Sequence, residues 1–134
     1  MVHAEGMTST RPVQVGGGLL LAGLGLFLAF SPLTVAAALG LPHDTSSQAI
    51  NLRATWGGSM LGLGAFVLWL RGLRPMRRAL LGLLLWFMAG VGLARAVGLV
   101  LDGSPDRLQW VWMGAEVLIA TACALALRRP GRTP

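Results

Sequence analysis

The chain has 134 residues, of which 54% are hydrophobic and only 12% are charged, and its mean hydropathy is +0.68. Soluble domains carry about 25% charged residues, so this composition predicts a one-domain integral membrane protein. The net charge of +6 comes from arginines at the ends of apolar runs, where they act as topology signals. We therefore expect no nucleic-acid partner, and the single Cys123 excludes an intrachain disulfide. No pattern of residues predicts a metal site or a cofactor.

The first apolar run follows a polar segment, residues 1–12, that we expect to be a disordered cytoplasmic N-terminus. Residues 13–30 are rich in Leu and Gly, and their length approaches the roughly 20 residues that cross a bilayer. Small residues at positions 36–38 imitate a signal-peptide cleavage site, so cleavage, which would leave three helices, is the alternative.

The dipeptide Ser31-Pro32 predicts a break after this span, because Ser caps helices and Pro suits the first helical position. A short extra helix is therefore expected over residues 33–39. It would either lie at the outer interface or continue the first span with a kink.

Thr45 and Gln48 have the spacing of a capping box, which predicts the start of a second span over residues 49–70. Small residues recur on one face of this span at helical spacing, and such faces let helices approach closely in lipid. The predicted packing residues of the whole chain are Ala54, Gly57, Gly58, Gly62, Ala65 and Gly98.

The remaining apolar runs predict a third span over residues 79–101 and a fourth over residues 107–127. Between them, an Asp-Gly pair marks a turn, Ser104 is a predicted helix cap and Pro105 a predicted first helical residue. The expected fold is all-α: a four-helix transmembrane bundle over residues 13–127, followed by a cytoplasmic tail over residues 128–134.

Arginine placement predicts the orientation of the four spans. One side holds Arg11, the arginines of residues 71–78 and those of the tail, whereas the other side holds at most Arg53 and Arg107. Positive residues stay cytoplasmic, so both termini are expected in the cytoplasm.

Two ionisable residues fall inside apolar spans. Glu116 is near the middle of the fourth span, and Arg95 lies six residues before Leu101, about 10 Å from the outer surface at 1.5 Å per residue. Helical side chains tilt toward their own N-terminus, so these two side chains lean toward each other. An ion pair that fixes helix register, a polar pocket floor in which Glu116 exchanges a proton, and an unpaired protonated Glu116 all remain open.

Other polar residues accompany this pair. Gln109 lies seven residues before the glutamate, and Asp102 seven after the arginine, at the water boundary. We expect Arg53 to extend to lipid headgroups, Asn51 to form a hydrogen bond at a helix end, and His43 to be an ordinary loop residue. The candidate ligand-binding or buried polar cluster comprises Arg53, Arg95, Glu116, Asn51, Gln109 and Asp102.

Two segments carry a family resemblance. The segment beginning at Asn51 follows an N-x-R-x-x-x-G-G-x-x-x-G-x-G pattern, and the one beginning at Arg95 follows R-x-x-x…D-G-x-P…E. Over residues 13–127 the chain resembles the bacterial domain-of-unknown-function family numbered 4345, small four-helix inner-membrane proteins. The resemblance implies no activity, and it implies that the family pattern includes Asn51, Arg53, Gly57, Gly58, Arg95, Asp102 and Glu116.

These observations leave three functional hypotheses. The first is a non-enzymatic module that binds a lipid or quinone at the Arg/Glu cluster. The second is a structural or partner-binding subunit of a homo- or hetero-oligomer, with the small-residue faces as docking surfaces. The third, least favoured, is an intramembrane isomerase-like enzyme with Glu116 as acid and base, because the spans contain no deep His, Ser–His or metal set. No catalytic residue is assigned, and the expected partners are membrane lipid and a hydrophobic small molecule.

Overall fold

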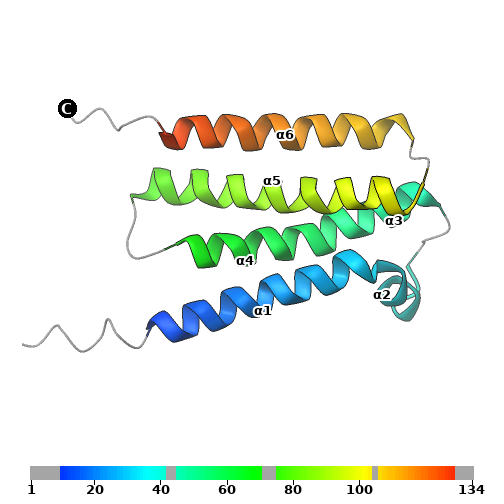
Figure 1. Cartoon of the computed structure of the whole chain (residues 1–134), viewed down its shortest axis with the longest axis horizontal. Coiled ribbons are helices and arrows are strands. Elements are labelled where there is room, and N and C mark those ends of the chain that lie inside the picture. Colours follow the sequence, from blue (N-terminus) through cyan, green and yellow to red (C-terminus); the bar gives the residue numbers. More distant parts are fainter. Residues whose placement is uncertain (1–9, 42–44, 71–74, 104–105, 129–134) are drawn as a thin grey trace, which may run out of the picture.

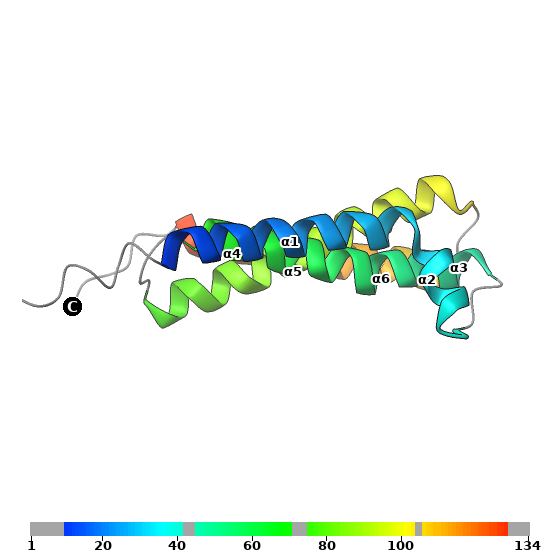
Figure 2. The ribbon, with the colours of Figure 1, turned by 90° about the horizontal axis from the view of Figure 1, so that it is seen from below.

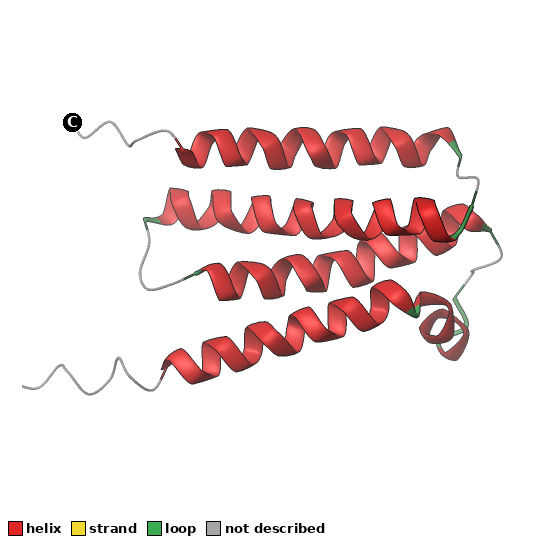
Figure 3. Ribbon diagram, in the orientation of Figure 1, coloured by secondary structure: helices red, strands yellow, loops and turns green. Residues whose placement is uncertain are grey.

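The computed structural model describes residues 10–41, 45–70, 75–103 and 106–128, and every regular element in these ranges is helical (Figure 3). The predicted all-α class is confirmed. His43, Ser104 and Pro105 lie outside the described residues. The elements are α1 (Thr10–Phe30), α2 (Pro32–Ala38), α3 (Ser46–Leu52), the π-helical turn η1 (Arg53–Gly58), α4 (Ser59–Trp69), α5 (Met76–Leu101) and α6 (Arg107–Arg128).

The long helices lie side by side in the order α1, α4, α5, α6 (Figure 1). Helix α1 packs on α4 and η1, these pack on α5, and α5 packs on α6. The main contact of α6 is with α5, so α6 forms one edge of the row. Among the described residues, three helical segments are long and apolar enough to cross a membrane: Pro12–Phe30, α5 and α6.

The break after the first helix falls at Ser31-Pro32 as predicted, and the short helix that follows begins one residue earlier than predicted. α1 begins at Thr10, inside the segment expected to be disordered, and α2 begins at Pro32. Ser31 occupies the N-cap position, but its side chain makes no capping hydrogen bond. Helix α2 turns away from the direction of α1 (Figure 2), so it does not continue the first helix. Gly40, with a φ of +64°, ends the segment in a conformation that favours glycine.

The capping box at Thr45 is confirmed. Its hydroxyl accepts from the Gln48 backbone N–H at 3.2 Å, and the Gln48 side chain accepts from the Thr45 N–H at 3.1 Å. The helix therefore starts at Ser46, three residues before the predicted start.

A π-helical turn interrupts this helix without ending it. Leu52, Gly58 and Ser59 all have right-handed helical dihedrals, so the chain stays helical from α3 through η1 to α4. A π turn widens the backbone and loosens its hydrogen bonding. Here the Thr55 hydroxyl donates to the Asn51 carbonyl at 2.6 Å, and the Ser59 hydroxyl donates to the Thr55 carbonyl. Such turns occur often at functional sites.

The small-residue stripe is filled by other helices of the same chain. A Cβ added to Gly58 would lie 2.5 Å from the Cα of Val91 on α5, and one added to Gly57 would lie 2.5 Å from the backbone nitrogen of Ala29 on α1. Gly62 lies similarly close to the backbone of Trp86, so backbone meets backbone at each position. Ala54 is fully buried, whereas Ala65 is half-buried. The stripe is therefore an internal packing surface, and the hypothesis that it docks a partner is wrong for these glycines.

Candidate functional site

Arg95 forms the centre of a buried polar cluster between α5 and α6. Its Nε lies 3.0 and 3.1 Å from the two carboxylate oxygens of Glu116, and its Nη2 lies 2.8 Å from Oε1. The two side chains are only 4% and 7% exposed. The tilt of side chains toward helix N-termini predicted that these two groups would meet, and they form an ion pair across the hairpin.

Two amide side chains complete the surroundings of this guanidinium. Its Nη1 donates to the Oδ1 of Asn51 at 2.9 Å and also to the Oε1 of Gln109. The Gln109 amide nitrogen then donates to the Ser47 carbonyl at 3.4 Å. Asn51 on α3 accepts a hydrogen bond from Arg95 on α5. Its predicted role as a hydrogen bonder at a helix end is therefore wrong. The Arg95 cluster (Arg95, Glu116, Asn51 and Gln109) thus joins α3, α5 and α6.

Arg53 does not extend to the surface as predicted. Its Nε and Nη2 bind the two carboxylate oxygens of Asp102 at 2.6 and 2.8 Å, and its Nη1 donates to the carbonyl of Ala29. That carbonyl lies in the last turn of α1, where carbonyls lack helical partners. Gly98 makes room for the arginine stem, since a Cβ there would lie 3.2 Å from the Arg53 Cδ. The Asp102 carboxylate and the Ala29 carbonyl together hold the Arg53 side chain inside the protein.

The structure therefore divides the six predicted cluster residues into two groups. Arg53 and Asp102 form one, which we call the Arg53 clamp, and it connects α1, η1 and the end of α5. Each group pairs one arginine with one carboxylate, so each is formally neutral. Of the two groups, the Arg95 cluster adjoins a cavity formed by described residues.

This cavity has a volume of about 550 Å³ and lies between α5, α6 and the α3–η1 segment. Its polar lining residues are Asn51, Thr55, Arg95 and Glu116. Its apolar walls are formed by Phe87, Met88 and Val91 of α5 and by Trp112, Ala115 and Ile119 of α6.

Sequence reasoning missed these wall residues, although helical spacing marks several of them. Val91 precedes Arg95 by four positions, while Trp112 and Ile119 lie four before and three after Glu116. Residues at these spacings share a helix face. The helix faces that carry Arg95 and Glu116 could therefore have identified several residues of the cavity wall.

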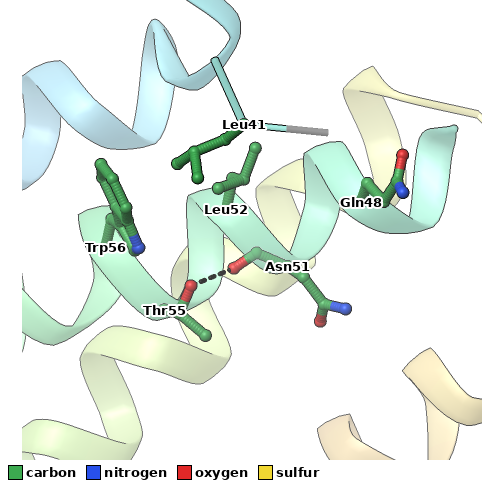
Figure 4. A pocket seen from close by; sticks show the side chains of 6 residues that line it. All are labelled: Leu41, Gln48, Asn51, Leu52, Thr55 and Trp56. Carbon is green, nitrogen blue, oxygen red and sulfur yellow. Dashed lines mark hydrogen bonds between the residues drawn. The ribbon is translucent and has the colours of Figure 1, made fainter. Parts of the chain in front are cut away.

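A second hollow of about 360 Å³ adjoins the first one. Asn51 and Thr55 line both, and Leu41, Gln48, Leu52 and Trp56 complete the second. Figure 4 shows the Asn51 amide pointing away from Leu41, and the Thr55 hydroxyl bonded to the Asn51 backbone oxygen. The Asn51 side chain is thus turned out of the second hollow.

Within the described residues, the fold and the buried pairs define a helical protein with three helices that could cross a membrane and two arginine–carboxylate pairs in its interior. The family model described as "Domain of unknown function (DUF4345)" matches residues 10–127, and the chain belongs to this family. The resemblance predicted from the two segments is confirmed. No curated protein and no solved structure matches the chain.

Proposed function

We propose that this protein crosses the bacterial inner membrane four times and binds a small amphipathic molecule, a lipid or quinone, in the cavity beside the Arg95 cluster. Its spans are α1, the continuous α3–η1–α4 helix, α5 and α6, with both termini in the cytoplasm. It acts as a binding module rather than an enzyme.

Four spans are supported by the length of the interrupted helix. From Ser46 to Trp69 it extends about 36 Å at 1.5 Å per residue, which is enough for a hydrocarbon core of about 30 Å. Four spans also put the arginine-rich segments on one side. Large exposed apolar side chains on α1 and α6, such as Leu20 and Leu118, suit contact with lipid tails.

The observation that carries the binding proposal is the cavity beside a buried ion pair. Its volume lies within the range of about 300–1,000 Å³ that is typical of small-molecule sites, and its lining combines apolar side chains with a few polar ones. An amphipathic molecule matches this division, with its tail along the walls and its head at the cluster. Both Glu116 oxygens already accept hydrogen bonds from Arg95, which favours binding over acid–base catalysis.

A pair of adjacent substitutions tests the proposal. Ile119→Trp adds a large ring at a wall residue, whereas Leu118→Trp adds the same ring at a residue that is 70% exposed and does not line the cavity. With the full chain in lipid nanodiscs, we expect Ile119→Trp to weaken binding of decylubiquinone or monolaurin at least tenfold, and Leu118→Trp to leave it unchanged. Equal binding by both variants, or no binding by the wild type, would overturn the proposal.

A further inference from the structure

Most N–H donors of the Arg95 guanidinium already form hydrogen bonds within the protein. Nε–H donates to Glu116, both Nη1 hydrogens go to amide oxygens, and Nη2 donates to Glu116 again. An arginine has five N–H donors and no acceptor. Four of the five therefore already donate within the protein, and an anionic head could reach only the second Nη2 hydrogen without displacing Glu116 or one of the amides.

The cavity wall also carries no net charge. Among its lining residues only Arg95 and Glu116 are ionisable, and they neutralise each other at 2.8 Å. A charged head that entered would lose its hydration without gaining a counter-charge, which is strongly unfavourable in an apolar environment. An uncharged head does not meet this penalty.

The orientation of the Asn51 amide leaves one donor group available. Its oxygen must face Arg95, because a guanidinium can only donate. Its nitrogen must then point the other way, and in the described part of the chain that nitrogen has no hydrogen-bond partner. Asn51 is an exposed residue that lines the cavity, so the NH₂ group can reach a ligand there.

The neighbouring Thr55 adds an acceptor. Its hydroxyl hydrogen is committed to the Asn51 backbone carbonyl at 2.6 Å, so the hydroxyl oxygen keeps its lone pairs as acceptors, and Thr55 lines the cavity. Asn51 and Thr55 therefore present an amide donor and a hydroxyl acceptor to the cavity that both residues line, and both groups are uncharged.

We infer that the cavity selects an uncharged amphiphile whose head carries a carbonyl or ester oxygen, bound by the Asn51 amide, and that it discriminates against anionic and cationic heads. This inference rests on the proposed function and names the class of ligand for the same site. A hydroxyl on the head would donate to Thr55, as in a monoacylglycerol.

Head-group selection is tested with probes that share one tail. Monolaurin, dodecyl phosphate and dodecyltrimethylammonium are titrated into the full chain in nanodiscs of uncharged lipid, and dissociation constants are measured by isothermal titration calorimetry. We expect monolaurin to bind at least tenfold more tightly than either charged probe. Equal or tighter binding of a charged probe overturns the inference. If Ile119→Trp blocks that binding, the proposed function survives; if it does not, both fail.

The role of Asn51 is tested by Asn51→Asp, which keeps an oxygen for Arg95, removes the donor and adds a negative charge. Loss of one hydrogen bond predicts about tenfold weaker binding of monolaurin. Binding of dodecyltrimethylammonium should increase, and that gain would also show that the variant is folded. Unchanged affinity for monolaurin overturns the inference.

Gln48→Glu is the matched control for this variant. It makes the same change from amide to carboxylate on the same helix, keeps the oxygen that accepts from Thr45, and lies outside the cavity wall. We expect its affinities for all three probes to equal those of the wild type. A loss equal to that of Asn51→Asp would mean that charge at this end of the helix, rather than the Asn51 donor, controls binding, and would overturn the inference.

Discussion

The two buried arginines occupy regions of opposite character. Arg53 lies where α1, η1 and α5 are in close contact, and its third partner is a backbone carbonyl. Arg95 lies at the contact between α5 and α6, where α6 forms the edge of the row. Besides Glu116, its partners are two amide side chains beside a cavity. The same arginine–carboxylate pair thus stabilises helix packing in one region and, as we propose, forms part of a binding site in the other.

The difference follows from the size of neighbouring residues. Gly57 and Gly98 bring helices close together around the Arg53 clamp, where an added Cβ would meet Ala29 or the Arg53 side chain. On α6, large residues such as Trp112 and Ile119 stand around the cavity. Close packing fixes geometry, whereas the open edge leaves a volume that a ligand can fill.

The largest expected effect is on the Arg53 clamp. Arg53→Ala leaves the Asp102 carboxylate and the Ala29 carbonyl without their partner, and removing one member of a buried pair costs about 3–5 kcal/mol. Thermal unfolding in detergent should show a large loss of stability. The control is Arg78→Ala at an exposed position, expected to change stability by less than about 0.5 kcal/mol. If the two variants unfold at the same temperature, the clamp does not stabilise the fold.

The corresponding change at the cavity should be milder. Glu116→Gln removes the charge but keeps an oxygen that can accept from Arg95, and the adjacent cavity allows water to approach the cluster. We expect a loss of about 1–3 kcal/mol in the free energy of unfolding, smaller than for Arg53→Ala. Chemical unfolding curves of the two variants measured together would check the order. The reverse order would contradict the contrast between the two regions.

Two glycine substitutions compare a position that is closely packed with one on α6 that is open. Gly58→Ala places a methyl group 2.5 Å from the Val91 backbone, and overpacking of this kind costs about 1–3 kcal/mol. Gly114→Ala meets no atom within 4 Å and removes a helix-interior glycine, so it should stabilise by about 0.5–1 kcal/mol. Opposite shifts in melting temperature are expected. Shifts of the same sign would show that both regions are packed alike.

The smallest expected effect concerns the π turn that lies between the two regions. Thr55→Val removes the hydroxyl that donates to the Asn51 carbonyl and should cost about 0.5–1.5 kcal/mol. Thr121→Val, at an exposed position of α6, provides the comparison and should have almost no effect on the melting temperature. Equal melting temperatures for the two variants would mean that the π turn does not depend on this hydroxyl.

Much of the fold could be predicted because its signals are local. The Thr45 capping box, the break at Pro32 and the facing of Arg95 and Glu116 all follow from short-range geometry. The tilt of helical side chains was sufficient to predict that Arg95 and Glu116 face each other, because both residues belong to one hairpin.

The pairing of Arg53 was predicted wrongly for a reason that is not local. Its partners Asp102 and Ala29 lie 49 and 24 positions away in the sequence. Their approach depends on η1, which changes the register of the helix, and on glycines that let three helices converge. The orientation of the Asn51 amide likewise depends on a distant residue, because Arg95 on another helix donates to its oxygen.

By itself, the sequence determined that the chain forms long apolar helices, their bounds to within about three residues, and which two charges face each other in the last hairpin. Hydropathy and hydrogen bonding between near neighbours decide these features. Only the tertiary structure decided which arginine adjoins a cavity and which is enclosed, because that depends on how closely distant helices pack and on the order in which they stand.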